Sequence, residues 1–190
     1  MQQSYILASG SRWRRRLLKK HGISCKVHVS QFQEKVHHKN PRTLVLHNAC
    51  GKAKAVARLY KNAVVIGVDT IGVYRGKFLG KPANRGQARE MLKLLSGNTH
   101  RVISGLCLID ALTGRKIMTA VTTKVTFRKI GNRELEKYLD SGHWKGKAGS
   151  YAIQGRAKGF VKKIEGDVTN VVGLPILTLK KILQKLHAGK

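Results

Sequence analysis

Acidic residues are scarce in this chain of 190 residues. Nine aspartates and glutamates stand against 38 lysines and arginines, which gives a formal net charge of +29. Aromatic residues make up only 6% of the chain, whereas surfaces that bind single-stranded nucleic acid interleave aromatic and basic side chains. The basic residues are also spread along the whole length, without a basic tail. We therefore interpret most of this charge as a general property of the surface, with non-specific nucleic-acid binding as a secondary expectation.

Cysteine and long apolar runs are also lacking. The three cysteines, Cys25, Cys50 and Cys107, include no CxxC pair, and the eight histidines show no HxxxH spacing. These features exclude a disulfide framework and argue against a dedicated zinc site. No apolar run approaches the roughly 20 residues of a membrane span or the core of a signal peptide. We expect a cytoplasmic protein with no membrane partner.

The remaining composition is that of a globular protein, with 42% apolar residues. The expected domain spans residues 1–190, either as one body or as two lobes with a cleft between them. Hydrophobic periodicity predicts an α/β fold with a mixed, elongated central sheet flanked by helices. The expected strands are 4–8, 25–29, 63–69, 71–74, 78–79, 99–110, 116–127, 151–154 and 159–164, and the expected helices are 12–21, 42–60, 84–95, 131–139 and 174–186.

Asp69 is the most informative of the few acids. It closes the apolar run Ala63–Val68, so we expect a buried strand that ends by presenting a carboxylate at the carboxyl edge of the sheet. Ligands bind at that edge in open α/β sheets. The alternative is an aspartate that caps a turn or a helix, and position alone does not choose between the two.

The segment from Ile6 to Arg15 predicts an anion site. A strand leads through Ser9-Gly10-Ser11 into a helix whose first turn is rich in arginine. Free backbone N–H groups at a helix N-terminus bind anions, and arginine there is unfavourable to the helix dipole unless an external anion compensates. Phosphate is the natural candidate, and the fork of an arginine can bind it. The alternative is an ordinary strand–helix turn with solvated arginines.

Two further groups of residues have side chains suited to phosphate chemistry. Glu34, Lys52, Asp69 and Lys81 combine carboxylates that can hold a metal ion or a water with ammonium groups that neutralise phosphate, although Lys52 alone could be a solvated lysine. The stretch Lys147–Gly155 combines small residues with Gln154, whose amide can read the edge of a base. It could equally be a glycine-rich turn.

Taken in order along the chain, these segments closely resemble the Maf family of nucleoside triphosphate pyrophosphatases. The resemblance covers almost the whole chain. It rests on 6–11 with Arg14-Arg15, on 40–41, 52–53, 66–70, 80–82, 95–100 and 125–128, and on 147–155, 164–167 and 170–175.

The resemblance implies hydrolysis of a nucleoside triphosphate to the monophosphate and pyrophosphate, with Mg²⁺ or Mn²⁺ as cofactor and a homodimer as the assembly. It implies a fold like that of inosine-triphosphate pyrophosphatases. Asp69 would be the general base and Glu34 would assist the metal or the water. The triphosphate and the nucleotide would be held by Ser9, Arg14, Lys52, Lys81 and Lys147.

The positions that set specificity in the family disagree with one another here. Thr70 and Gln154 resemble the branch that acts on dTTP and UTP, whereas Trp13 resembles the branch that acts on 7-methyl-GTP, whose electron-poor base would stack on a tryptophan. Two positions against one favour dTTP and UTP, with 7-methyl-GTP as the alternative.

The chain also departs from the family. Arg12 replaces a usual proline, and Gln31-Phe32-Gln33 lacks the usual additional aspartates before Glu34. The +29 charge keeps open a different class, a nucleic-acid-binding protein on a degenerate Maf scaffold, whose binding would weaken steeply with salt. A role in cell division, historically attached to the family, has no residue here that supports it.

Overall fold

A computed structural model describes residues 3–36 and 38–188 of the chain. The strands are β1 (Ser4–Leu7), β2 (Lys26–Val27), β3 (Ala63–Tyr74), β4 (Lys77–Leu79), β5 (Thr99–Asp110), β6 (Lys116–Phe127) and β7 (Val161–Glu165). The α-helices are α1 (Arg12–Lys20), α2 (Pro41–Ala57), α3 (Arg85–Leu95), α4 (Asn132–Asp140), α5 (Val168–Val172) and α6 (Ile176–His187), and short 3₁₀ helices span Ala148–Ser150 and Arg156–Phe160.

The strands form one seven-stranded mixed sheet with the order β2-β1-β3-β5-β6-β7, and β4 pairs with β3 beside this path. β1 runs parallel to both β2 and β3, whereas the β3–β4 and β6–β7 pairs are antiparallel. The predicted α/β class with a mixed sheet and flanking helices is therefore confirmed.

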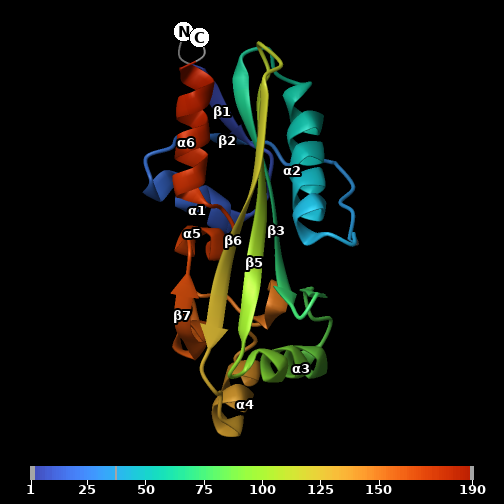
Figure 1. Cartoon of the computed structure of the whole chain (residues 1–190), viewed down its shortest axis with the longest axis vertical. Helices are drawn as coiled ribbons and strands as arrows, with labels where there is room; N and C mark the ends of the chain where they lie inside the picture. Colours follow the sequence, from blue (N-terminus) through green and yellow to red (C-terminus); the bar gives the residue numbers. More distant parts are fainter. Residues whose placement is uncertain (1–2, 37, 189–190) are drawn as a thin grey trace. The chain divides into compact units, whose positions relative to one another are not determined.

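The chain divides into two compact units. The first comprises residues 1–70, 103–121 and 173–190, and the second comprises residues 71–102 and 122–172. In the first unit α2 and α6 lie on opposite sides of the strands (Figure 1). Each face buries its own apolar cluster, one that includes Leu7, Ile66 and Leu179 and one that includes Ile6, Val65 and Ala53.

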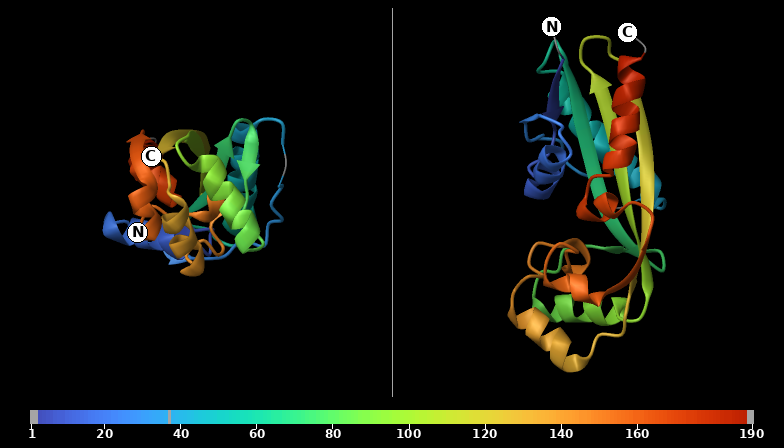
Figure 2. Two further views of the ribbon diagram at one scale, coloured as in Figure 1. Left: turned by 90° about the horizontal axis from the view of Figure 1, so that it is seen from below. Right: turned by 90° about the vertical axis from the view of Figure 1, so that its left-hand side faces the viewer.

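The second unit has a separate core rich in aromatic side chains, including Phe127, Tyr151 and Phe160. Its helices α3 and α4 lie side by side (Figure 2). Arg85 forms ion pairs with Glu136 and Asp140 across these helices. This surface network therefore uses acids that are scarce in the chain to join two helices.

Helix α2 packs unusually close to the sheet because two glycines make room for its backbone. A Cβ atom at Gly67 would lie 2.1 Å from the Ala49 carbonyl oxygen, and one at Gly105 would lie 2.3 Å from the Val45 carbonyl oxygen. Real Cβ atoms are not found so near to backbone oxygens. Only glycine at these two positions permits this approach, and it brings the side chains of α2 within reach of β3.

Several expected elements differ from the structure. The predicted strand 151–154 is a loop in which Tyr151 and Ile153 anchor the core, so its alternating burial imitates a strand. The predicted strand 159–164 begins only at Val161, and helix α5 was not predicted. The predicted strand 25–29 shrinks to the two exposed residues of β2, at the edge of the sheet.

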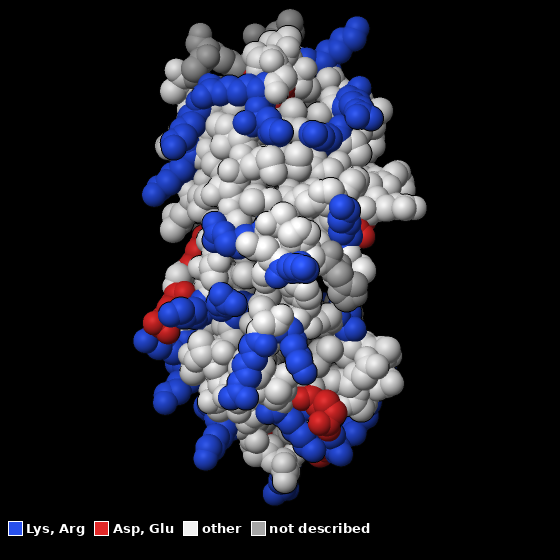
Figure 3. All heavy atoms as spheres, turned by 45° about the vertical axis from the view of Figure 1, so that its right-hand side comes forward, with Lys and Arg blue, Asp and Glu red and all other residues white. Residues whose placement is uncertain are grey.

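Basic side chains are scattered over the face shown in Figure 3, and acidic ones appear at few places on that face. Among the described residues, no helix combines the length and the apolar character needed to cross a membrane. The cysteines Cys25, Cys50 and Cys107 are free thiols.

Candidate active site

Asp69 lies within β3 and not at its end, which corrects the expectation from the sequence. The strand continues to Tyr74 because Ile71–Tyr74 are again apolar or small. Its partner β1, however, pairs with β3 only as far as Ile66. Asp69 therefore still projects beyond the carboxyl end of a parallel strand, where the expected edge lies.

Alternation along β3 directs Asp69 toward α2. Ala63 and Val65 belong to the cluster that packs against α2, and Gly67 touches the α2 backbone. Side chains at every second position of a strand share a face, so Asp69 faces α2 as well. It is 6% exposed.

Lys52 of α2 connects two carboxylates. Its Nζ atom lies 3.0 Å from Oδ1 of Asp69 and 2.9 Å from Oε1 of Glu34. A third hydrogen bond, of 3.3 Å, reaches the Val68 carbonyl oxygen. An ammonium group has three donors, so all of those of Lys52 point at protein acceptors. Lys52 is buried, and the alternative of a solvated lysine is wrong.

Asn48 is the residue that sequence reasoning missed. Its Nδ2 atom donates to Oδ2 of Asp69 at 3.1 Å and to the Lys35 carbonyl oxygen at 2.9 Å, while its Oδ1 accepts from the Lys35 N–H at 2.9 Å. Asn48 thus fixes the backbone next to Glu34 and orients Asp69 at the same time. A signal existed, because Asn48 and Lys52 lie four residues apart on the buried stripe of α2, where a polar side chain needs partners.

Arg14 joins three segments that meet at this edge of the first unit. Its guanidinium donates to the Gly173 carbonyl oxygen at 2.9 Å, to Ser9 Oγ at 2.9 Å, to the Val68 carbonyl oxygen at 3.1 Å and to Thr70 Oγ1 at 3.1 Å. Burial lowers the pKa of Arg14, and the carboxylates of Asp69 and Glu34 partly offset that shift.

The Val68 carbonyl oxygen explains why two cations meet here. Beyond Ile66, which accepts from the Ala8 N–H at 2.9 Å, β3 has no further residue of β1 to pair with. Arg14 and Lys52 both donate to Val68 and so satisfy a backbone acceptor that β1 leaves unpaired. An unpaired buried carbonyl would be costly.

Two of the remaining predicted residues of the first unit, Ser9 and Thr70, contact Arg14. Ser9 is buried and accepts from Arg14. Thr70 Oγ1 lies 2.8 Å from Ser104 Oγ and donates to the Gly173 carbonyl oxygen at 3.2 Å, so its hydroxyl is engaged within the protein. Trp13 is half-buried, and the Arg16 guanidinium lies 5.1 Å from its ring centroid.

The other predicted residues belong to the second unit. Lys81 is exposed and Lys147 is half-buried. Their loops are adjacent, because the Gly149 N–H donates to the Gly80 carbonyl oxygen at 3.0 Å. Gln154 is exposed in the turn after Ile153. Gly149 and Ser150 both have positive φ angles, of 68° and 66°, so the loop after Lys147 is held in a conformation that non-glycine residues rarely adopt.

Asp69 and Glu34 fit the requirements of a divalent ion. Carboxylate oxygens are the ligands that Mg²⁺ prefers, and it commonly takes one or two of them together with water and substrate phosphates. No cluster of three or more His, Cys, Asp or Glu side chains suited to a metal occurs in residues 3–36 and 38–188. Two carboxylates are thus what this edge offers.

Fold and site together define a mixed α/β protein in which a lysine-bridged pair of carboxylates lies beside a serine-containing strand–helix turn. The sequence pattern of the family described as "Maf-like protein" matches residues 4–186, and the chain belongs to this family.

Relatives of similar length share substantial identity. The dTTP/UTP pyrophosphatase of Pyrococcus horikoshii is 46% identical over 171 residues, covering 90% of each chain. That of Methanosarcina barkeri is 42% identical over 182 residues, covering 95% of this chain and 92% of the relative. That of Dictyoglomus thermophilum is 38% identical over 188 residues, covering 98% and 97%.

Proposed function

We propose that this protein is a nucleoside triphosphate pyrophosphatase that acts on dTTP and UTP. The observation that carries the proposal is the buried Asp69 carboxylate, held by Lys52 at one oxygen and by Asn48 at the other. The names of the relatives, dTTP/UTP pyrophosphatase, support the substrate. Thr70 and Gln154, which resemble the same branch, agree with them.

Asp69 acts as the general base in this proposal. Each of its oxygens accepts one protein hydrogen bond, and a carboxylate can accept about four. Acceptor capacity therefore remains for a water molecule. That water adds across the anhydride between the α- and β-phosphates and yields the monophosphate and pyrophosphate, while Asp69 takes its proton.

Ser9, Arg14 and Lys52 of the first unit bind the triphosphate in this proposal. The family resemblance implies a binding role for Lys81 and Lys147 as well, whose loops are adjacent within the second unit. Glu34 would help to hold Mg²⁺ or Mn²⁺, which when bound would neutralise charge on the phosphates. The homodimer implied by the family resemblance and the cytoplasmic location expected from the lack of long apolar runs stay predictions.

A panel assay tests the proposal. Phosphate release, coupled to inorganic pyrophosphatase, is measured for dTTP, UTP, CTP, 7-methyl-GTP and the standard purine triphosphates with Mg²⁺ or Mn²⁺. We expect the fastest turnover with dTTP and UTP. Phosphate release should depend on the coupling enzyme, because pyrophosphate is the product. Fastest turnover of 7-methyl-GTP would instead indicate that Trp13 determines the specificity. Folded protein that turns over no nucleotide would overturn the proposal and favour the nucleic-acid-binding alternative.

A further inference from the structure

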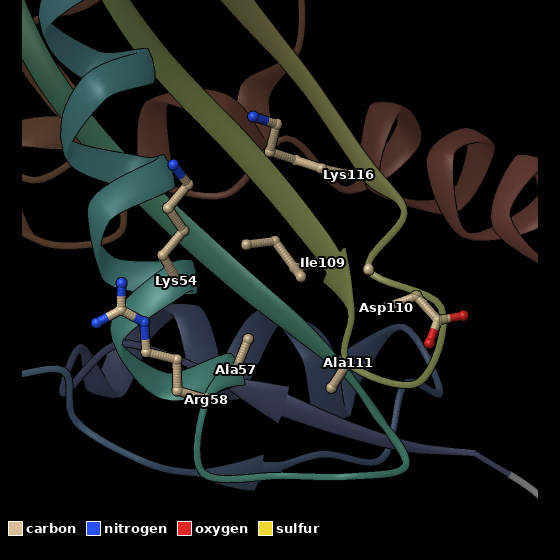
Figure 4. A pocket seen from close by; sticks show the side chains of 8 residues that line it. Lys54, Ala57, Arg58, Ile109, Asp110, Ala111 and Lys116 are labelled. Carbon is tan, nitrogen blue, oxygen red and sulfur yellow. The ribbon is translucent and has the colours of Figure 1, made fainter.

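A second concave site lies in the first unit, at the C-terminal end of α2. The pocket has a volume of about 440 Å³ and is lined by Lys54 and Arg58 of α2, Ile109 of β5 and Lys116 of β6. Figure 4 shows Lys54 and Lys116 projecting from different elements with Ile109 between them. Its volume falls within the range of roughly 300–1,000 Å³ that small-molecule sites occupy.

This pocket is separate from the candidate active site. The Ala111 N–H donates to the Ala63 carbonyl oxygen at 2.8 Å, which places the pocket beside the first residue of β3. Asp69 lies six residues farther along the same strand. With a rise of about 3.3 Å per residue, that separation is roughly 20 Å.

The pocket concentrates positive charge. In the part of the chain that the structure describes, no ion pair is found for Lys54, Arg58 or Lys116. The one carboxylate of the lining, Asp110, is 1% exposed and accepts hydrogen bonds from the Gln3 side chain and from the backbone of the turn after β5. Figure 4 shows this carboxylate directed away from the lysines. Three cations and one carboxylate leave a net charge of +2 in the lining.

Helix stability accounts for only part of this arrangement. Basic residues are favourable near a helix C-terminus, which explains Lys54 and Arg58 on α2. It does not explain Lys116, which comes from β6. Lys54 and Lys116 both influence the Cys107 thiol. Burial raises the pKa of this thiol and Cys50 raises it further, whereas the ammonium groups of Lys116 and Lys54 lower it.

We propose that this pocket binds a small anion with two or more phosphate groups. Like charges that meet without a counterion repel one another, and an external polyanion would relieve that repulsion. Phosphate groups suit the fork of Arg58 and the point charges of the two lysines, and Ile109 offers an apolar floor. The pocket is small, with a volume of about 440 Å³, which favours a small molecule over an extended nucleic-acid strand.

Calorimetric titration tests the proposal with inorganic pyrophosphate and thymidine diphosphate as probes, at low ionic strength. The variant combines Lys54→Gln, Arg58→Gln and Lys116→Gln. The matched control combines Lys180→Gln, Lys181→Gln and Lys185→Gln, which removes the same charge from exposed positions of α6. We expect the pocket variant to bind one probe molecule fewer per chain than the wild type, or to bind that molecule with an affinity lower by about tenfold or more. We expect the control to match the wild type.

The two probes distinguish the source of the anion. Loss of binding for pyrophosphate alone would support an inorganic ligand, and a larger loss for thymidine diphosphate would support a nucleotide whose base or sugar contacts Ile109. Equal binding by the pocket variant, the control and the wild type would overturn the proposal. The dTTP turnover of the pocket variant should equal that of the wild type, so a failure here is distinguishable from a failure of the proposed function.

Discussion

Arg14 and Lys52 donate hydrogen bonds to the same acceptor, the Val68 carbonyl oxygen, at 3.1 and 3.3 Å. One comes from α1 and the other from α2. The next residue of β3 is the proposed general base. The backbone of β3 is therefore fixed by two cations immediately before Asp69, and this shared acceptor links the strand–helix turn to the carboxylate site.

Arg14→Lys should destabilise the protein, because a lysine cannot reproduce four hydrogen bonds that diverge from one planar group. Buried acceptors left without a donor cost about 1–3 kcal/mol each, so we expect a loss of at least roughly 2 kcal/mol. Chemical denaturation measures it. Arg15→Lys, on the exposed side of α1, is the matched control, and an equal effect of both changes would contradict the account.

Asn48→Leu should affect stability and rate together. It leaves both backbone groups of Lys35 without their partner, and each loss costs about 1–3 kcal/mol. It also frees Asp69 and Glu34 to shift, and misplacement of about 1 Å can lower a rate about 100-fold. Melting temperature and kcat on dTTP measure the two effects. Thr43→Leu, an exposed position of the same helix, should change neither. A stable Asn48→Leu variant with full activity would disprove the positioning role.

Gly67→Ala should push α2 away from β3. The added methyl group would lie 2.1 Å from the Ala49 carbonyl oxygen, and overpacking of this kind typically costs about 1–3 kcal/mol. Because Asn48 and Lys52 belong to α2, turnover should fall as well. Gly159→Ala adds the same methyl group in open space at an ordinary φ angle and serves as the control in thermal unfolding. Equal melting temperatures for the two variants would refute the close packing.

His100 should make stability depend on pH. Burial lowers its pKa from 6.5 to about 4, so the unfolded chain takes up a proton in a range where the folded protein does not. The neutral His100 therefore contributes fully to the free energy of unfolding above pH 6.5. This contribution is lost as the pH falls toward 4, by roughly 3 kcal/mol at most. Denaturation of the wild type and of His100→Phe across this range should show a smaller pH dependence in the variant. His143→Phe, at an exposed position, should retain the full dependence.

The sequence predicted the long elements and several of the residues that meet around Asp69. Strands β5 and β6 have the predicted bounds, because their alternating and β-branched residues extend without interruption between clear turns. The predicted partners Glu34, Lys52 and Asp69 do meet in one cluster. Asp69 indicated that cluster because it follows a buried apolar run and was therefore expected at the ligand-binding edge of the sheet.

Other features depended on contacts that no local pattern encodes. The loop 151–154 alternates like a strand because Tyr151 and Ile153 are drawn into the core of the second unit. The role of Asn48 depends on the backbone of Lys35, which lies 13 residues away in sequence. The convergence of Arg14 and Lys52 on Val68 follows from where β1 stops pairing, which the composition of β1 does not determine.

The most direct test of the account is the turnover of dTTP by Asp69→Asn. The amide nearly preserves the shape of the side chain but cannot accept a proton from water, so we predict a loss of about 100- to 10,000-fold in kcat with an unchanged circular dichroism spectrum. Asp110→Asn, at a buried aspartate that ends β5, should retain wild-type kcat. Undiminished turnover by folded Asp69→Asn would remove this carboxylate from the mechanism and contradict the account.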